Sequence, residues 1–489
     1  MMIGIDAGTS VVKAAAFSND GENLAVESRP TKVYSPSPDQ SEQDFEEVVA
    51  AVGKVVRAVT ERSGEDPDAI GLTGQGDGLW LFEEQGYSVR PAILWLDARA
   101  NSVVEEWMSS GVFEAAFRRN GNIIFPGSHA PLLVALERSE PESLEQATTV
   151  GYCKDGILQR LTGERATDAS DASLPFLDVR TRRYDKEILK LCGLERWEHL
   201  LAPIDPAPGP MRPLNAEGSK LIGLPEGIPV HSGPFDLPAS AIGAGVDEPG
   251  EGLIILGTTL ACEVFTDRVE TDGEVGGLTL CALESDRWLR AMPAMVGTAS
   301  LDWVLSLIGA EHKDIEEFLE ESGPGARGAT ALPFFSASGE RAPFVDPAAR
   351  GQVAGLSLGA TRADVVSAIC ESVGYAARHC LDAAGLEGEV AICGGGVESA
   401  AWRQILADVL QKPLRIARRP EVGARGAAIA ALIASERDFD YAKWTRPDGY
   451  VEPREEMAGL YEEGFAYYLD SVEAARGLWS GRPRARTPQ

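Results

Sequence analysis

Short apolar runs separated by a polar turn open the chain. Ile3 and Ile5, and then residues 11–17, have the composition of β-strands, and the small polar residues 6–10 stand between them. Asn19-Asp20-Gly21 is a second turn signal, of the kind that closes β-hairpins. The pattern therefore predicts an N-terminal strand–turn–strand unit.

The next segments alternate between a helical pattern and strand patterns. Valines recur with helical spacing over residues 43–62, and residues 69–73 form an apolar run bounded by turn residues. A Gly-rich loop and a further apolar run at 79–82 follow. We predict a helix, a buried strand and a second strand in this order.

The clearest helical patterns lie in the second half of the chain. A capping-box pattern at residues 361–364 predicts the start of a helix that ends near Gly385. An apolar stripe over residues 402–410 predicts another helix, which follows three glycines at 394–396 and precedes a strand at 414–417.

One pattern occurs twice in the chain. An apolar strand leads into a Gly-Thr turn and out into a second strand, first around Gly8 and again around Gly257. Such a repeat predicts two similar halves, each presenting a phosphate-binding hairpin. We place the boundary between the halves near residues 240–250, and we predict a close-packing helix of small residues at 426–434.

Composition narrows the classes of protein. The 489 residues carry a net charge of −30, with 44% hydrophobic and 25% charged residues. This is ordinary globular usage over a length that suits two or more domains, and it argues against disorder, nucleic-acid binding and attachment to an anionic membrane. An acidic chain can still bind ATP, because phosphate sites use backbone N–H groups and Mg²⁺ as well as basic side chains.

The cysteines and histidines indicate neither a disulfide framework nor a metal site of their own. Seven Cys are scattered without a C-x-x-C pair, and the five His show no ligand spacing, so we take the histidines as structural or surface residues. The N-terminus lacks the features of a signal peptide, and no apolar run reaches the roughly 18 residues of a membrane span. We expect a cytoplasmic protein.

The N-terminal turn is the first candidate for chemistry. Gly8 lets the backbone approach a phosphate, and Thr9 and Ser10 offer hydroxyl and amide donors. Asp6 at the strand end could hold Mg²⁺, and Lys13 could add positive charge. The alternative is an ordinary hairpin turn.

Two segments of the second half are candidates for binding a nucleotide. Gly257 and Thr258 repeat the phosphate-binding pattern, and Gly394 with the two glycines after it permits a flat surface against a purine or ribose. The spacing matches neither a P-loop nor a Rossmann fingerprint. A tight strand-to-helix turn is the alternative for the three glycines.

Asp236 is a candidate catalytic carboxylate. It follows a predicted strand in a loop shaped by Gly233 and Pro234. In a kinase, a carboxylate accepts the proton of the substrate hydroxyl, while positioning and Mg²⁺ supply most of the rest. Aspartate is also a common turn former, so the local sequence leaves both interpretations open.

A polar loop with two tryptophans is the candidate for substrate recognition. Gln75, Asp77 and Asp97 can hydrogen-bond hydroxyl groups, and Trp80 or Trp95 can stack on a sugar face. The alternative is a polar loop beside a core tryptophan.

Together these segments resemble the FGGY family of carbohydrate kinases. The resemblance runs in order from about residue 2 to about residue 437, and the order of the blocks makes it far more specific than any one of them. One departure is that Leu132-Leu133-Val134-Ala135 stands where the family usually has a Lys-Leu-x-Trp core. The matching blocks read IGIDAGTSVVKAAAF, IGLTGQGDGLWLFEEQGYSVRPAILWLDARA, LTGERATDASDAS, HSGPFDLPASAIGAG, ILGTT, GERAPFVDPAARG, CGGGVESAAWRQILADVLQKPL and EVGARGAAIAA.

The resemblance implies an α/β protein of two ribonuclease-H-like domains, of the actin/hexokinase superfold, which close over a cleft. Its N-terminal domain at 1–245 would carry the substrate and the catalytic base, and its C-terminal domain at 246–440 would bind the nucleotide. We predict a helical tail at 441–489 that ends in a basic, proline-containing stub.

The resemblance also implies roles for single positions, with ATP and Mg²⁺ as cofactors. Asp236 matches the family's catalytic base, and Asp6 matches its Mg²⁺-linked aspartate. The predicted substrate-binding residues are Gln75, Asp77, Trp95, Asp97 and Asp236. The predicted cofactor-binding residues are Gly8, Thr9, Ser10, Lys13, Gly257, Thr258, Gly394, Gly395 and Ser399.

The loop at residues 76–78 narrows the substrate. D-xylulose kinases usually show Met-His-Gly where this chain has Gly76-Asp77-Gly78, and glycerol kinases carry an Arg-Glu pair there. The string looks most like the erythritol-kinase branch, with the L-xylulose-kinase branch close by. The expected substrate is a small polyol or ketose of four or five carbons, and the resemblance makes a homodimer plausible.

Other functions remain open from the sequence. A D-xylulose or other pentulose kinase with a variant loop differs from the first interpretation only in its substrate. A non-catalytic nucleotide switch, like the actin relatives, would need no small ligand at residues 70–100. A sugar-binding pseudokinase is disfavoured because Asp6 and Asp236 are both present.

Overall fold

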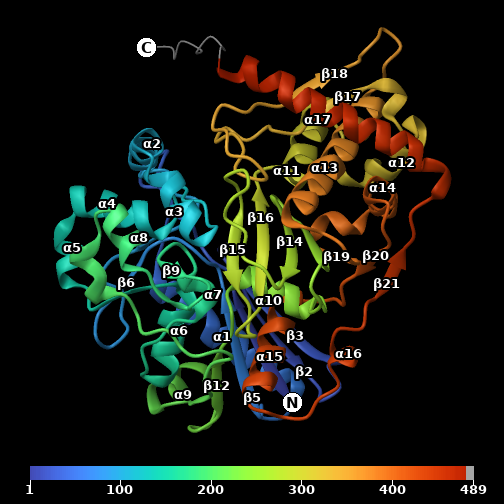
Figure 1. Cartoon of the computed structure of the whole chain (residues 1–489). Helices are drawn as coiled ribbons and strands as arrows, with labels where there is room; N and C mark the ends of the chain where they lie inside the picture. The colour runs from blue at the N-terminus through green and yellow to red at the C-terminus, as the bar shows by residue number, and fades with distance from the viewer. Residues whose placement is uncertain (481–489) are drawn as a thin grey trace. The chain divides into compact units, whose positions relative to one another are not determined.

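The chain folds into two compact units, each built from separated segments. The structure, a computed structural model, describes residues 1–480 (Figure 1). Unit 1 comprises Met1–Asp247, Phe265–Leu289 and Arg418–Arg446, and unit 2 comprises the described remainder. Each unit contains a sheet and helices, so the protein is mixed α/β. The domains predicted from the sequence are continuous stretches of the chain, whereas these units are groups of residues in contact in space. The predicted boundaries therefore stay a prediction.

Unit 1 is organised around a six-stranded sheet with the order β11-β12-β5-β1-β2-β3. Strand β1 (Met2–Ala7) pairs antiparallel with β2 (Val11–Phe17) and parallel with β5 (Ala69–Gly74). The predicted N-terminal hairpin is therefore confirmed. The predicted turn at residues 19–21 joins β2 to β3 (Asn23–Pro30), which pair antiparallel.

Helices cover both faces of this sheet. Helix α1 (Phe45–Ser63) packs on β1–β3, and α6 (Cys153–Thr162) packs on β5 and β12. Their apolar side chains form one core with the sheet. On the other side, α15 (Val422–Ala434) packs on β1 and β5 and against α10 (Asp236–Gly243) (Figure 1).

The helix of small residues is confirmed and is longer than predicted, since it begins at Val422. The backbone of α15 packs unusually close to the backbone of strands β1 and β5. A Cβ atom at Gly4 would lie 1.8 Å from the carbonyl oxygen of Ala424, and one at Gly71 would lie 1.9 Å from that of Ala427. Small residues on both sides are thus required for α15 to approach β1 and β5 this closely.

The other elements of unit 1 are short. Its further strands are β4 (Glu42–Gln43), β6 (Trp80–Phe82), β7 (Ala92–Ile93), β8 (Thr149–Gly151), β9 (Leu177–Asp178), β10 (Arg183–Tyr184), β11 (Arg212–Pro213), β12 (Pro229–Ser232) and β15 (Leu278–Cys281). Its further helices are α2 (Asn101–Ser110), α3 (Val112–Asn120), α4 (His129–Ser139), α5 (Pro141–Gln146), α7 (Ala169–Ala172), α8 (Lys186–Leu191), η1 (Glu195–Leu200), α9 (Ala216–Ile222) and α16 (Tyr441–Trp444).

Unit 2 repeats the strand pairing of unit 1. Its strands follow the order β16-β14-β13-β19-β20-β21. Strand β13 (Gly252–Leu256) pairs antiparallel with β14 (Leu260–Thr266) and parallel with β19 (Val390–Cys393). The hairpin β1–β2 next to β5 has the same arrangement, so the repeat predicted around Gly8 and Gly257 is confirmed.

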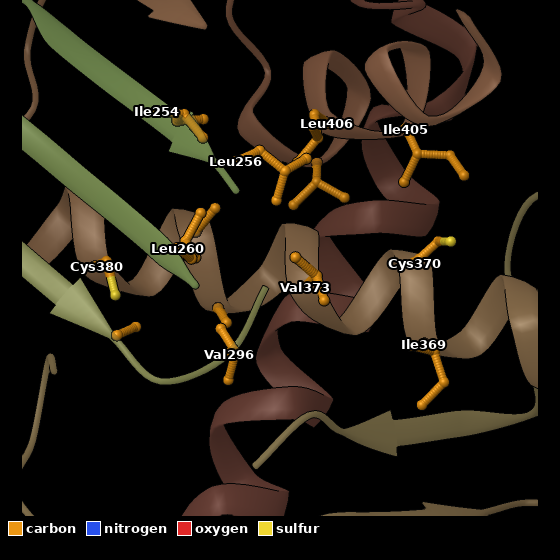
Figure 2. Close-up of a cluster of buried hydrophobic side chains, with 14 of the residues drawn as sticks. Ile254, Leu256, Leu260, Val296, Ile369, Cys370, Val373, Cys380, Ile405 and Leu406 are labelled. Carbon is orange, nitrogen blue, oxygen red and sulfur yellow. The ribbon is translucent and has the colours of Figure 1, made fainter. Parts of the chain in front are cut away.

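Two long helices complete the core of unit 2. Helix α13 (Arg362–Ala384) begins at the predicted capping box, where the backbone N–H of Thr361 donates to Asp364 Oδ2 at 2.8 Å. Helix α14 (Ala400–Leu410) matches the predicted apolar stripe. Figure 2 shows buried side chains of β13, β14, α13 and α14 meeting in one apolar cluster.

The remaining elements of unit 2 include the last helix of the described chain. They are α11 (Thr298–Ile308), α12 (Ile315–Ser322), α17 (Ala458–Ser480), β16 (Trp288–Ala294), β17 (Thr330–Leu332), β18 (Gln352–Ala354), β20 (Leu414–Ile416), β21 (Gly449–Val451) and the short η2 (His312–Asp314), η3 (Ala326–Gly328), η4 (Gly395–Glu398) and η5 (Glu455–Met457). The predicted basic stub falls at residues 481–489, outside the described residues. Within residues 1–480, no helix is long and apolar enough to cross a bilayer.

Candidate active site

The carboxylate of Asp6 is half-buried at the end of β1, beside the Gly-Thr-Ser turn. Burial raises the pKa of Asp6 to about 6, Lys13 opposes this rise and Glu421 adds to it. Lys13 is the β2 residue directly opposite Asp6, and its Nζ lies 2.8 Å from Glu421 Oε2. The charge of Lys13 is therefore paired within the protein.

Asp6 also lies against the first turn of α15. A Cβ atom at Gly423 would lie 2.8 Å from Asp6 Oδ2, so only glycine leaves room for the carboxylate there. The N-terminal end of a helix favours negative charge. The structure thus places a half-buried carboxylate where its ionised form has some electrostatic support.

Asp236 is the first residue of α10 and is half-buried. Burial raises the pKa of Asp236 to about 8, the charges of Asp6 and Asp77 add to the rise, and the backbone N–H of Leu237 opposes it. The predicted base, the predicted Mg²⁺ aspartate and the predicted substrate carboxylate therefore share one electrostatic neighbourhood within unit 1. Mutual repulsion of this kind is typical of functional sites.

The loop before Asp236 is held from two sides. Thr73 Oγ1, at the end of β5, donates to the carbonyl oxygen of Pro234 at 2.7 Å. The backbone N–H of Phe235 donates to Ser170 Oγ at 3.1 Å. These two bonds fix the backbone immediately before the candidate base.

A hydrogen-bonded network joins the phosphate turn to the substrate loop. Thr9 Oγ1 donates to Gln75 Oε1 at 2.8 Å and accepts from Trp95 Nε1 at 3.0 Å. Gln75 Nε2 donates to Gln43 Oε1 at 2.8 Å, and Gln43 Nε2 donates to the carbonyl oxygen of Thr9 at 2.9 Å. Three predicted site residues, Thr9, Gln75 and Trp95, are thus brought together.

Asp77 has a strained backbone. Its φ of 54° lies in the left-handed region, which is uncommon for a residue other than glycine, and its side chain is buried. On the neighbouring position, a Cβ atom at Gly76 would lie 2.5 Å from the ring of Phe235. Local strain at a buried carboxylate is the kind of feature that persists at functional sites.

Asp97 and Trp80 have structural surroundings. The oxygens of Asp97 accept from the backbone N–H of Ser41 at 2.7 Å and from the backbone and side chain of Arg99 at 2.9 Å. Asp97 therefore anchors the loop that carries Trp95. Trp80 is buried in the core, with its ring centroid 6.0 Å from that of Phe45, so stacking on a sugar through Trp80 is wrong.

Unit 2 holds the residues predicted for the nucleotide. Gly257 and Thr258 form the β13–β14 turn, and their carbonyl oxygens accept from the backbone N–H groups of Thr298 and Ala299 at 2.9 and 3.2 Å. Gly394 has a φ of 100°, and a Cβ atom there would lie 2.5 Å from the carbonyl oxygen of Leu256. Glycine is therefore required where β19 leaves the sheet beside β13.

The glycines and the following helix are separated by a short turn. Gly395 begins η4 and α14 begins at Ala400, so the predicted helix follows the glycines after this short turn. Ser399 Oγ accepts from the backbone N–H of Trp402 at 3.1 Å and caps α14. The Ser399 hydroxyl thus has a structural partner, whereas a Cβ atom at Gly395 would meet open space.

Comparison with known proteins decides the family. Residues 1–243 match the N-terminal domain of the FGGY family of carbohydrate kinases, and residues 252–435 match its C-terminal domain. The chain belongs to the FGGY family of carbohydrate kinases. It is accordingly a kinase that uses ATP to phosphorylate a sugar or polyol.

Individual relatives agree with the FGGY assignment over nearly the whole chain. An erythritol kinase of Brucella abortus (strain 2308) is 32% identical over 98% of this chain and 97% of its own. A xylulose kinase of Escherichia coli (strain K12) is 32% identical over 89% of this chain and 90% of its own. The crystal structure of xylulose kinase from Rhodospirillum rubrum has a TM-score of 0.89 at 28% identity, covering 98% of this chain and 99% of that one. The predicted fold, that of the actin/hexokinase-like sugar kinases, is confirmed.

The sequence interpretation missed a buried charge cluster in this FGGY kinase. Lys154 Nζ, with a side chain 0% exposed, lies 3.0 Å from Asp155, 2.7 Å from Asp168 and 3.0 Å from Asp171. It also lies 3.4 Å from Ser232 Oγ, in the strand that leads to Asp236.

The cluster supports the loop of the candidate base. Asp168 Oδ1 accepts from the backbone N–H of Ser170, and Ser170 Oγ accepts from that of Phe235. Three contacts therefore lead from Lys154 through Asp168 and Ser170 to Phe235, the residue before Asp236. The only signal in the sequence was that Asp168 and Asp171 are three residues apart. This spacing becomes informative only when the fold places Lys154 beside both carboxylates.

Proposed function

We propose that this kinase transfers the γ-phosphate of ATP to a hydroxyl of an uncharged polyol or ketose of four or five carbons, with Asp236 as the general base. The observation that carries the proposal is the shared neighbourhood of Asp6, Asp77 and Asp236 within unit 1. Erythritol- or L-xylulose-kinase-like activity is the first candidate. A D-xylulose or other pentulose kinase is the second, supported by the 32% identity to the E. coli xylulose kinase.

Asp236 suits the role of base by position and by environment. A base near the operating pH combines a useful fraction of the ionised form with a strong pull on the hydroxyl proton. Burial raises the pKa of Asp236 to about 8, which brings it into that range. The hydrogen bonds to Pro234 and Phe235 hold the backbone that carries Asp236, and positioning accounts for much of phosphoryl-transfer catalysis.

Asp6 fits a magnesium ion bound together with nucleotide phosphates. The charge of Asp6 contributes to the raised pKa of Asp236, so the two carboxylates are near each other. A cation bound beside them would relieve their repulsion. No cluster of three or more His, Cys, Asp or Glu within residues 1–480 could hold a metal by itself. Mg²⁺ needs only one or two protein carboxylates when phosphates supply further oxygens, and when bound it neutralises charge on the transferred phosphoryl group.

The charges of the substrate side favour a neutral substrate. Asp77 and Asp236 are carboxylates, and the Lys13 ammonium is already paired with Glu421. An acceptor such as Asp77 suits a pair of adjacent hydroxyls, whereas an aldonate carboxylate would meet like charge. We therefore place sugar acids below neutral polyols and ketoses as substrates.

Nucleotide-binding residues are proposed for each unit by itself. Gly8, Thr9 and Ser10 of unit 1 and Gly257 and Thr258 of unit 2 would bind phosphate oxygens through backbone N–H groups and hydroxyls. Gly394 and Gly395 would face the adenosine, because the open space at Gly395 admits a flat group.

The test is ADP release from Mg-ATP in the presence of a substrate panel. The panel contains erythritol, other tetritols and pentitols, glycerol, gluconate, and both enantiomers of xylulose and ribulose. We expect strong stimulation by one neutral compound of four or five carbons. Turnover of glycerol, gluconate or a hexose alone would contradict the substrate assignment, while stimulation by D-xylulose alone would select the second candidate.

Location and assembly are further proposals. We propose a cytoplasmic protein, because all seven cysteines are free and buried, as suits a reducing compartment. A homodimer is proposed from family membership. Analytical ultracentrifugation should give a mass of about twice the 52.2 kDa chain, and a monomer at micromolar concentration would contradict it.

A further inference from the structure

His129 is a buried histidine whose ring nitrogens have no hydrogen-bond partner within residues 1–480. It is the first residue of α4 and is 1% exposed. Its ring packs against Tyr152, at 4.9 Å between centroids, and against Phe176, at 6.0 Å. Neither Nδ1 nor Nε2 has a hydrogen-bond partner among the described residues.

This arrangement is costly for the folded protein unless something else bonds the ring. Burial lowers the pKa of His129 to about 3, so the imidazole is neutral and carries one N–H donor and one acceptor nitrogen. A buried polar group left unbonded costs about 1–3 kcal/mol, and more than nine in ten such groups have a partner. A partner from outside the chain is therefore expected at His129.

His129 lies next to the substrate loop. Two residues before it, the carbonyl oxygen of Gly127 accepts from the backbone N–H of Gly78 at 3.0 Å. A Cβ atom at Gly127 would lie 1.9 Å from the carbonyl oxygen of Trp95, so this segment lies directly on the tryptophan segment as well. The chain before α4 is thus in contact with both parts of the candidate substrate loop.

Tyr152 supplies a second link between His129 and the loop. Its ring contacts His129, and its hydroxyl donates to the carbonyl oxygen of Leu174 at 2.7 Å. The pKa of Tyr152 is raised well above its usual range, first by burial and then by nearby charges that include Asp171 and Asp77. Tyr152 therefore contacts His129 and is near enough to the Asp77 carboxylate for its charge to act on the phenol.

We propose that His129 is a specificity-determining residue that hydrogen-bonds a hydroxyl of the sugar or polyol substrate. The inference rests on the proposed function and deepens it. A hydroxyl both donates and accepts, which matches a neutral imidazole. The rings of Tyr152 and Phe176, which pack against His129, give apolar surroundings that suit the carbon skeleton of such a substrate. A site built to bond a hydroxyl strongly rejects an analogue that lacks it, because its own polar groups are then left unbonded.

The first experiment compares His129→Phe and His129→Asn with the wild type over the substrate panel. His129→Phe should raise KM for the best substrate by about 10-fold or more, since about 1.4 kcal/mol corresponds to a factor of ten, and leave KM for ATP within about 2-fold. His129→Asn, which keeps a donor and an acceptor, should recover part of the loss. The preference for the best substrate over its deoxy analogue should fall in His129→Phe.

A matched control removes another buried imidazole. His231 is also buried, but its Nε2 lies 2.9 Å from the carbonyl oxygen of Pro208, so it has a partner within the chain. His231→Asn should lower the melting temperature and leave KM for the sugar or polyol within about 2-fold. An equal rise of KM in both variants would overturn the proposal, because the effect would then be one of general packing.

A second measurement does not depend on whether the variants fold. Imidazole ¹⁵N chemical shifts of the wild type should change at His129 when the best substrate is added without ATP, and not when ATP is added alone. Unchanged His129 shifts at saturating substrate would overturn the proposal. If no panel compound is turned over, the proposed function fails as well, whereas an active enzyme with unchanged KM in His129→Phe contradicts the His129 proposal alone.

Discussion

The two hairpins of the molecule have the same strand pairing and different chemistry. In unit 1, Asp6 lies two residues before Gly8 and pairs with Lys13 on β2 and with Thr73 on β5. At the same position of unit 2, Ile255 lies two residues before Gly257 and pairs with Ala261 and Cys393. One hairpin therefore carries a half-buried carboxylate with a charged neighbour, and the other carries an apolar side chain at the equivalent point.

Under the proposed function, this difference separates the catalytic role of the first hairpin from the nucleotide-binding role of the second. A Gly-Thr turn can cradle phosphate in either hairpin, since the backbone N–H groups are the same in both. In the proposed function, Asp6 in the unit 1 hairpin holds a cation and Asp236 of the same unit accepts a proton. Burying Asp6 and Asp236 raises the pKa of each, which shows that their ionised forms are destabilised in the folded protein, as is common where function opposes stability.

The largest expected effect is that of Asp236→Asn. Loss of the general base should lower kcat by about 100-fold to 10,000-fold, with the dissociation constant of the substrate within about 3-fold of the wild type. Stopped-flow or coupled assays measure kcat, and calorimetry without ATP measures binding. Near-normal turnover would show that Asp236 is not the base. The proposed difference in catalytic role between the two units would then lose its main support.

Lys154→Met should have the largest effect on stability. It leaves Asp155, Asp168 and Asp171 buried without their cation, and breaking a buried ion pair in this way costs about 3–5 kcal/mol. Urea unfolding at pH 7 measures the free energy of unfolding. Lys186→Met is the control, because Lys186 is 78% exposed and its ion pair with Glu198 should contribute at most about 1 kcal/mol. Equal losses in the two variants would contradict the structural role of the cluster.

A matched pair of variants addresses the two hairpins directly. Asp6→Asn should lower kcat by at least about 100-fold and raise the Mg²⁺ concentration needed for half-maximal activity, because one metal-binding oxygen is lost. Ile255→Val should cost about 0.5–1.5 kcal/mol of stability and leave kcat within about 2-fold. Activity as a function of Mg²⁺ concentration is the measurement. A similar kcat for Asp6→Asn and Ile255→Val would show that the hairpins do not differ in function.

A smaller, pH-dependent effect is expected in unit 2. Burial raises the pKa of Glu371 to about 7, although its Oε1 accepts from the Gly325 N–H at 2.7 Å and the Tyr461 hydroxyl at 3.3 Å. The folded state holds a proton that the unfolded state has lost, so stability falls as pH rises from the unfolded value of 4.5 through about 7.

Glu371→Gln removes this titration. Relative to the wild type, the variant should gain roughly 1–3 kcal/mol of unfolding free energy between pH 5 and pH 8. Thermal or urea unfolding at the two pH values measures the gain. Glu317→Gln, at an exposed position of α12, is the control and should show no such change. A gain that does not depend on pH would contradict the assignment of the titration to Glu371.

Local patterns predicted the fold because they depend on neighbouring residues. The hairpin turn after Asp6, the capping box at Thr361 and the small-residue helix α15 are all formed within short segments. The order of the blocks that resemble the FGGY family then identified the family. Asp6 and Asp236 could be placed only through that resemblance, since a single aspartate after a strand has many ordinary uses.

The remaining parts of the site depend on tertiary contacts. Lys154 and His129 look like ordinary helix residues until the fold places three carboxylates around one and the substrate loop beside the other. Asp97 and Ser399 are polar residues in suitable positions, and only the structure shows that Arg99 and the α14 N-terminus already occupy them. Spacing along the chain cannot distinguish a side chain directed at a ligand from one bonded to the protein.

The most direct test is ³¹P NMR of the products formed from Mg-ATP and the best panel compound. We predict one phosphomonoester of the sugar or polyol for each ADP, with little inorganic phosphate. The contrary result is ADP accompanied by inorganic phosphate alone, at a rate that does not depend on any added polyol or ketose. It would contradict phosphoryl transfer to a substrate hydroxyl with Asp236 as the base, and it would favour a nucleotide switch.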